Sequence, residues 1–432
     1  MEIVQLPTPR NEVKAVRSLR AVTSLLARSR SVETRRVSWI VVSRVAVGGA
    51  GLATVLLTSR LLSTNARGLF ATVQAAVLVA SVVGCASLWL GVSVVLPKHP
   101  HARGMALVAS LAWSALLLGA GSLGIASGAA EGVAAAPVLA AFVIVSVTVM
   151  LYTNVQGMPI GLNQITTYAK AEILRAAVGV TALVTLLAIG QRHPSHLLLI
   201  WGISSWGAAT AYLVLRSRPY GRTHDWTLLR GVVSRSLRAH PNNIIALGVL
   251  RLDILVLAAL SSRTQVAFYS FAVALSEGVW LIPGAIAVVG LADYSRLDAP
   301  AAASAARRNL RRAFLAAFAT AIVLLAAGVL LILFFLQPAY HAAIVPLAVS
   351  IAGALLYSAN HAVNPWIVVA LDRPGFSSLI AIGTLALNMI LLVMLASHGA
   401  TGAAIASASS YALASCVYIV VLRRRRTTAV SP

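Results

Sequence analysis

Acidic residues are scarce in this 432-residue chain: Asp and Glu together number 11, and all charged residues make up only 10%. A soluble protein carries about 25% charged residues, so this composition excludes a water-facing surface. Only two cysteines are present, Cys85 and Cys416, and both lie inside apolar runs, which excludes a disulfide framework and a cysteine metal cluster. No Walker A loop, metal-ligand spacing or nucleophile elbow is present. We therefore expect no catalytic residue, no metal and no cofactor, and we expect a protein that is not an enzyme.

Hydrophobic residues make up 59% of the chain, and the mean hydropathy is +0.88. A helix of roughly 20 apolar residues crosses the hydrocarbon core of a bilayer. Twelve runs meet this criterion, with boundaries near 39–58, 69–96, 105–126, 133–154, 170–190, 195–215, 241–261, 266–291, 313–336, 341–362, 377–396 and 400–422. The sequence therefore predicts an all-α integral membrane protein with twelve transmembrane helices.

Arg and Lys together number 34, and their distribution sets the orientation of these spans. Basic residues collect in cytoplasmic loops. If both termini are cytoplasmic, 27 basic residues lie inside, three lie within spans, and the outside loops hold four, namely Arg60, Arg67, Arg192 and Arg263. This alternation predicts a multi-pass protein of the plasma membrane with both ends in the cytoplasm. It also accounts for the basic pI through contact with anionic lipid headgroups, so we expect no nucleic-acid partner.

The predicted spans fall into two sets of six, and each set repeats the same local signals. The exits from spans one and seven read Thr58-Ser-Arg-Leu-Leu-Ser-Thr-Asn-Ala-Arg-Gly-Leu-Phe70 and Ala258-Ala-Leu-Ser-Ser-Arg-Thr-Gln-Val-Ala-Phe-Tyr269. The turns after spans four and ten read Gly161-Leu-Asn-Gln-Ile-Thr-Thr-Tyr168 and Ala370-Leu-Asp-Arg-Pro-Gly-Phe376. Because each half has an even number of spans, the repeats are expected to be parallel and to enclose a central cavity.

This pattern divides the chain into five parts. They are a basic cytoplasmic segment (1–38), a six-helix bundle (39–215), a basic cytoplasmic linker (216–240), a second six-helix bundle (241–422) and a basic cytoplasmic tail (423–432).

Twelve spans in two halves resemble the Wzx-type oligosaccharide and polysaccharide repeat-unit flippases of the multidrug/oligosaccharidyl-lipid/polysaccharide (MOP) exporter superfamily. The resemblance also rests on Arg-Leu-Leu-Ser…Arg67-Gly-Leu-Phe70 and on Arg251-Leu-Asp253…Phe268-Tyr269-Ser270…Glu277…Pro283-Gly284. The chain departs from the first family motif at two positions, with Ser63 in place of Gly and Arg67 in place of Tyr. The resemblance implies a transporter that works by alternating access.

Charged residues inside the spans are the candidates for function, because a charge near the bilayer centre costs about 2.5 to 3.5 kcal/mol or more. Arg251 and Asp253 lie in span seven, and Glu277 lies in span eight. Two residues of separation turn Asp253 to a different helix face from Arg251, so Glu277 is the expected partner of Arg251. These charges predict either a structural ion pair or a site for substrate or a coupling ion, with Asp253 and Glu277 as the ion-coupling candidates.

Other candidates for the cavity are Arg44, Asn360 and His361. Arg44 shares a helix face with Gly48 and Gly51, a small-residue stripe that allows close helix packing or lines a cavity, although an arginine at this depth can also reach the headgroups. Asn360 and His361 belong to a polar and aromatic cluster near the inner end of span ten.

These observations favour a flippase that moves a lipid-linked, anionic glycan precursor of the polyprenyl-pyrophosphate type for cell-surface polysaccharide biosynthesis, since guanidinium groups suit phosphate oxygens. A gradient of Na⁺ or H⁺ is an expected driving force, and a polysaccharide polymerase or glycosyltransferase complex is an expected partner. Two alternatives stay open: a cation-coupled multidrug exporter of the same superfamily, and a membrane scaffold of an envelope-synthesis complex that transports nothing.

Overall fold

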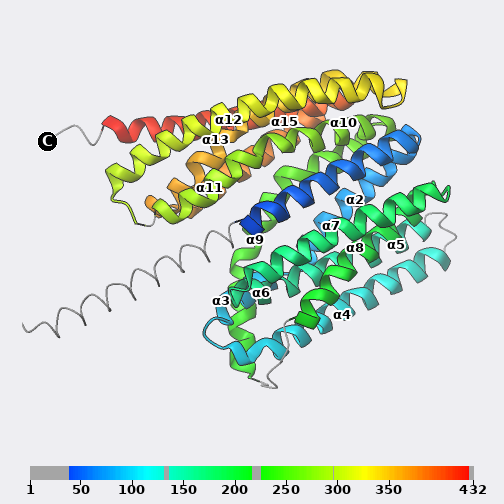
Figure 1. The fold of residues 1–432 in the computed structure, drawn as a ribbon, viewed down its shortest axis with the longest axis horizontal. Helices are drawn as coiled ribbons and strands as arrows, with labels where there is room; N and C mark the ends of the chain where they lie inside the picture. Colours follow the sequence, from blue (N-terminus) through cyan, green and yellow to red (C-terminus); the bar gives the residue numbers. More distant parts are fainter. Residues whose placement is uncertain (1–37, 131–135, 217–224, 295, 428–432) are drawn as a thin grey trace, which may run out of the picture.

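The computed structural model describes residues 38–130, 136–216, 225–294 and 296–427, and every regular element among them is helical (Figure 1). The first helix is Ser38–Leu61. The first half continues with α2 (Thr64–Gly84), α3 (Leu88–Val95), α4 (Arg103–Ala130), α5 (Ala136–Val155), α6 (Gly157–Gly161), α7 (Ile165–Ala188) and α8 (Pro194–Arg216). The second half contains α9 (Trp226–Leu260), α10 (Arg263–Ser276), α11 (Leu281–Tyr294), α12 (Ala299–Phe334), α13 (Ile344–Pro365), α14 (Pro374–Leu395) and α15 (Gly399–Thr427).

Eleven helical stretches in the described part of the chain are long and apolar enough to cross a membrane. The last of them, Pro374–Arg424, contains both α14 and α15, which are separated by a short 3₁₀ turn at Ala396–His398 and pack against each other. Twelve segments are therefore present, and the prediction of an all-α, multi-pass membrane protein is confirmed. The predicted terminal segment 1–38 lies outside the described residues except for Ser38, and the tail is described as far as Thr427.

The two halves form two bundles (Figure 1), each with a hydrophobic cluster of its own, and a third cluster joins Val55, Ala71 and Ala75 of the first half to the second half. In the first bundle α8 packs against α5 and α7, and in the second α13 packs against α12 and α15. Both bundles repeat an unusual turn after their fourth span: Asn163 and Asp372 each follow a leucine and adopt positive φ angles of 56° and 51°. Asn and Asp tolerate this conformation better than most residues. The matched turns are thus built in the same way in both halves.

The second part of the linker predicted at 216–240 is helical, because α9 already begins at Trp226. Asp225 caps this helix: its carboxylate accepts hydrogen bonds from the side-chain hydroxyl of Thr227 and from the backbone N–H groups of Thr227 and Leu228. These bonds, of which that from the Thr227 hydroxyl has the largest effect, hold the pKa of Asp225 below its ordinary value. The extension packs against α3, since a Cβ on Gly91 would meet the Val232 carbonyl oxygen at 2.2 Å. The sequence of this part of α9 was interpreted as a loop because Arg230, Arg235 and Arg238, all exposed, make it basic.

One contact between the two bundles, which we call the seam, lies at one end of the molecule; farther along, α9 also packs against α2 and α3, and Asn243 donates to Ser87 at 2.8 Å. The seam joins Arg60, Leu62, Thr64 and Gly68 of the first bundle to Arg263, Thr264 and Gln337 of the second. The Thr64 and Thr264 hydroxyl oxygens are 3.2 Å apart, and the Gln337 amide donates to the carbonyl oxygens of Arg60 and Leu62 at 3.0 and 2.9 Å.

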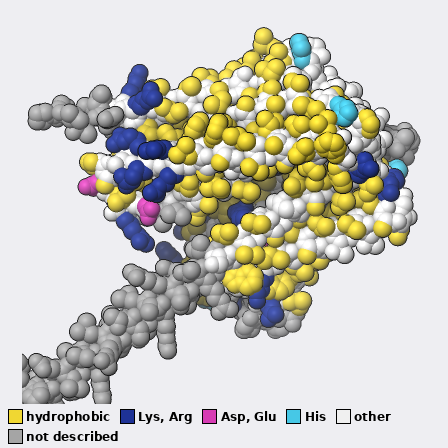
Figure 2. Space-filling model, turned by 45° about the horizontal axis from the view of Figure 1, so that its top comes forward, with side chains coloured by type: hydrophobic (Ala, Val, Ile, Leu, Met, Phe, Trp, Pro, Cys, Tyr) yellow, Lys and Arg dark blue, Asp and Glu magenta, His cyan; other side chains and the backbone are white. Residues whose placement is uncertain are grey.

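At the opposite end, which we call the basic end, Lys and Arg side chains gather and the surface is hollowed between the bundles (Figure 2). The first helix begins and α15 ends at this same end (Figure 1).

Candidate functional site

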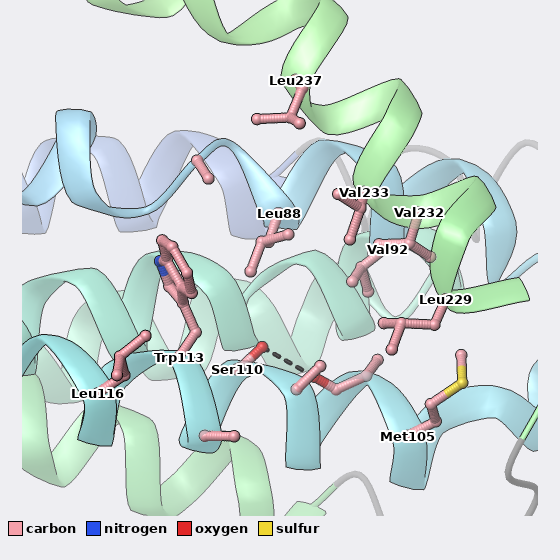
Figure 3. Close-up of a pocket in the computed structure, with 14 residues that line it drawn as sticks. Leu88, Val92, Met105, Ser110, Trp113, Leu116, Leu229, Val232, Val233 and Leu237 are labelled. Atoms are coloured by element: carbon pink, nitrogen blue, oxygen red, sulfur yellow. Dashed lines mark hydrogen bonds between the residues drawn. The ribbon is translucent and has the colours of Figure 1, made fainter. Parts of the chain in front are cut away.

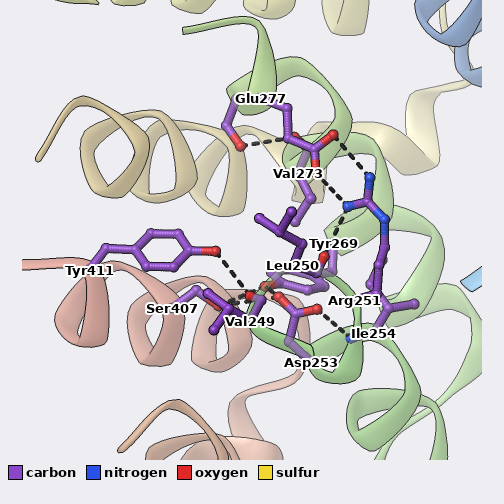
Figure 4. A network of polar contacts seen from close by, with 11 residues as sticks. Val249, Leu250, Arg251, Asp253, Ile254, Tyr269, Val273, Glu277, Ser407 and Tyr411 are labelled. Atoms are coloured by element: carbon purple, nitrogen blue, oxygen red, sulfur yellow. Dashed lines mark hydrogen bonds and ion pairs between the residues drawn. The ribbon is translucent and has the colours of Figure 1, made fainter. Parts of the chain in front are cut away.

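Arg251 and Glu277 form an ion pair between α9 and the break that separates α10 from α11 (Figure 4). Glu277 begins a short 3₁₀ segment, Glu277–Trp280, that interrupts the eighth span. The guanidinium contacts both carboxylate oxygens: Nη1 donates to Oε1, and Nη2 donates to Oε2 at 3.1 Å. Accessible fractions of 22% for the Arg251 side chain and 29% for the Glu277 side chain leave the pair within reach of a ligand. The expected partnership of these two residues is thus observed, while substrate contact stays a prediction.

Asp253 faces away from this pair and into the second bundle, as two residues of helical separation require (Figure 4). The Tyr269 hydroxyl donates to Asp253 Oδ2, the Ser407 hydroxyl lies 3.4 Å from the same oxygen, and the Asn388 amide donates to Ser407 at 3.3 Å. All four side chains are buried. Asn388 Oδ1 has no hydrogen-bond partner. Residues of α9, α10, α14 and α15 thus form one buried hydrogen-bonded cluster that includes Asp253. This cluster of hard oxygen ligands suits a proton or a small cation.

Four aromatic side chains pack together beside Glu277. Trp280 lies 5.6 Å from Tyr357, 5.8 Å from His361 and 6.0 Å from Tyr411, measured between ring centroids. The structure therefore brings His361 of α13 to the neighbourhood of the ion pair. The His361 Nε2 atom has no hydrogen-bond partner, and neither has the buried Oδ1 of the adjacent Asn360.

Arg44 is exposed on the first helix, near Tyr168 of α7. A Cβ added to Gly48 or Gly51 would meet no atom within 4 Å. The small-residue stripe of the first helix therefore faces open space. Its predicted role in close helix packing is not observed, and its role in lining a cavity stays a prediction. Two other charges of the first bundle, both in α7, pair with each other: Glu172 accepts from Arg175 at 2.6 Å and also from Tyr152 at 2.5 Å.

An apolar groove of about 400 Å³ lies between α3, α4 and the extended start of α9 (Figure 3). We call it the side groove. Its walls include Leu88 and Val92 from α3, Trp113 and Leu116 from α4, and Leu237 from α9. Sequence reasoning missed this groove, because the α9 extension that forms one wall was interpreted as a loop. Among the described residues, no cluster of three or more His, Cys, Asp or Glu could hold a metal ion.

Comparison with protein-family models found no match, and comparison with curated proteins also found none. Solved structures do match over most of the chain. An inward-facing multidrug resistance MATE family transporter of the MOP superfamily has a TM-score of 0.63 at 13% identity, covering 91% of this chain and 100% of its own. The lipid II flippase MurJ, in an inward closed conformation, has a TM-score of 0.66 at 10% identity, covering 88% of this chain and 87% of its own.

This chain has the fold of the MOP-superfamily transporters. The MATE multidrug transporter DinF-BH matches it as well, with a TM-score of 0.58 at 16% identity over 89% of this chain and 94% of its own. These neighbours share the arrangement of helices with the chain, and they include both drug transporters and a lipid flippase. The expected all-α fold with many membrane spans is therefore confirmed, and these neighbours do not single out one substrate class.

Proposed function

We propose that this protein moves a lipid-linked, anionic glycan precursor from the cytoplasmic to the outer leaflet of the plasma membrane by alternating access. The observation that carries the proposal is the partly exposed Arg251–Glu277 pair in a MOP fold. A pyrophosphate group cannot cross hydrocarbon unless its hydration is replaced. A guanidinium presents several N–H donors in a planar fork that matches phosphate oxygens, and Arg251 would exchange part of its contact with Glu277 for the cargo.

The contacts between the bundles support alternating access. The seam joins them at one end, α9 contacts α2 and α3 farther along, and the surface is hollowed at the basic end. If the basic end faces the cytoplasm, as the distribution of arginines predicts, cargo would be taken up from the cytoplasmic leaflet. Parting of the seam would then release it on the outside.

The side groove supports a cargo with a hydrocarbon chain. Its lining is almost wholly apolar, and Arg103 and Arg230 are close in sequence to its lining residues Met105 and Leu229. A lipid chain in this groove would keep its contact with apolar groups while the headgroup enters the space between the bundles.

Asp253 is the proposed coupling residue. Its buried oxygen cluster with Tyr269, Ser407 and Asn388 connects four helices of the second bundle. Binding of Na⁺ or H⁺ there would alter the packing of α9 against α10, α14 and α15, and so bias the conformation of the bundle that also carries Arg251.

A second candidate is export of organic cations, favoured by the aromatic cluster of Trp280, Tyr357, His361 and Tyr411 beside Glu277. Aromatic faces attract cations. Arg251, however, already neutralises Glu277, and the other carboxylate that acts on this cluster, Asp253, is buried rather than open to a ligand.

The test compares Arg251→Ala and Asp253→Ala with Arg312→Ala, a control on the exposed surface of α12. Exposure of the lipid-linked glycan at the cell surface is measured at matched protein levels. We expect a loss of tenfold or more in the two site variants and none in the control. Normal exposure in both site variants would refute the charged-site mechanism, and loss of organic-cation resistance instead would favour the exporter.

A further inference from the structure

Arg67 is a buried arginine at the seam. The residue was expected in an outside loop, but the structure places it in the second turn of α2 with 1% of its surface accessible. Its Nε and Nη1 atoms have no hydrogen-bond partner. The ion pairs among the described residues join Arg175 to Glu172 and Arg251 to Glu277, so neither includes Arg67. A buried charge without a partner is costly, and this one therefore needs an explanation.

Two further hydroxyl groups near Arg67 are buried without a hydrogen-bond partner. They belong to Ser59, at the end of the first helix, and to Tyr340, in the 3₁₀ segment Pro338–Ala343 of the second bundle. The Tyr340 hydroxyl adjoins Ser59 and lies within electrostatic reach of the Arg67 guanidinium. Aromatic rings enclose the group, since Phe70 lies 5.8 Å from the guanidinium and Phe268 lies 5.3 Å from the Tyr340 ring.

This arrangement gathers N–H and O–H donors around a positive charge, and none of the three groups is an anion. The guanidinium can only donate, and each hydroxyl is free to donate. We propose that Arg67, Ser59 and Tyr340 bind a small inorganic anion, with chloride as the abundant candidate, when the seam is closed. All three residues are at most 1% exposed, so the protein would enclose the anion.

The position of the site makes the anion a regulator of conformation. Ser59 and Arg67 belong to the first bundle, whereas Tyr340 belongs to the second. Parting of the seam separates these groups and dismantles the site. An anion that binds only the closed form shifts the equilibrium toward it by mass action. The inference rests on the parting of the seam that the proposed function requires, and it is independent of the identity of the cargo.

Disulfide formation across the seam tests this inference. The hydroxyl oxygens of Thr64 and Thr264 are 3.2 Å apart, so a disulfide between Thr64→Cys and Thr264→Cys reports closure of the seam. The native cysteines are removed by Cys85→Ala and Cys416→Ser, and copper phenanthroline is added to the full-length protein in vesicles. We expect chloride to raise the rate of disulfide formation several-fold over gluconate in a saturable manner. Arg67→Gln removes the charge, and we expect it to abolish this dependence. Arg312→Gln, at an exposed arginine of α12 away from the seam, should retain it.

Equal rates in chloride and gluconate would overturn the anion site, as would an unchanged chloride response in Arg67→Gln. Thermal unfolding gives a second measurement, because chloride should raise the Tm of the unmodified protein and not that of Arg67→Gln. Glycan export by the disulfide-linked protein separates the two proposals. A chloride response together with full export after linkage would contradict alternating access, whereas no chloride response together with blocked export would contradict only the anion site.

Discussion

Gly68 determines how closely the two bundles meet at the seam. A Cβ built on Gly68 would lie 1.8 Å from the Arg263 carbonyl oxygen, which is backbone and cannot rotate away. Carbon atoms in normal contact lie about 3.5 to 4.0 Å from their neighbours, so Gly68→Ala must move α2 away from α10 by roughly 1.5 Å or more. With alanine at this position, α2 and α10 can no longer approach each other as closely as they do in the closed seam.

The expected effect is a shift from the closed to the parted conformation. Overpacking of a well-packed contact costs about 1 to 3 kcal/mol, which corresponds to a decrease of roughly fivefold to more than a hundredfold in the ratio of closed to parted protein. The assay is disulfide formation between Thr64→Cys and Thr264→Cys, whose rate should fall by that factor. The matched control is Gly207→Ala in α8, where an added Cβ would meet no atom within 4 Å. An unchanged rate in Gly68→Ala would refute the close approach.

Three further perturbations address the site. Arg251→Ala and Glu277→Ala should each lower glycan export by about tenfold to a hundredfold, because charge-assisted hydrogen bonds contribute about 1.5 to 3 kcal/mol; additive losses in the double variant would exclude an interaction between the two residues. Asp253→Asn keeps the shape of the side chain and removes its charge, so export in vesicles should lose its dependence on an imposed Na⁺ or H⁺ gradient, and a preserved dependence would place coupling elsewhere. Ala109→Phe fills the side groove, whose wall includes Ala109; transport of lipid-linked cargo should fall several-fold at equal abundance, and an unaffected rate would mean that no lipid chain uses the groove.

The spans and the Arg251–Glu277 pair could be predicted because the bilayer imposes strong constraints on sequence. A charge in hydrocarbon is costly enough to require a partner or an aqueous path, and the spacing of Arg251 and Asp253 assigned them to different helix faces. The repeated turns at Asn163 and Asp372 were also visible, since a positive φ favours Asn or Asp.

Other parts of the site could not be predicted, because they arise from tertiary packing. Ser407 and Asn388 gave a weak signal, since hydroxyl and amide groups occur in membrane helices where neighbouring helices supply their hydrogen bonds. Arg67 was interpreted as a loop residue because its neighbours are polar, whereas contact with the second bundle buries it. The arginines of α9 and α12 likewise indicated loops, although alanines and valines on the opposite helix face extend both helices.

The central claim is transport of a lipid-linked, anionic glycan, and reconstitution tests it most directly. The protein is placed in vesicles with a polyprenyl-pyrophosphate oligosaccharide in one leaflet, and its appearance in the other leaflet is followed with a membrane-impermeant lectin. The account predicts protein-dependent appearance that stops when Thr64→Cys and Thr264→Cys are linked by a disulfide and falls at least tenfold in Arg251→Ala. Appearance at the rate of protein-free vesicles, together with protein-dependent efflux of an organic cation, would contradict it.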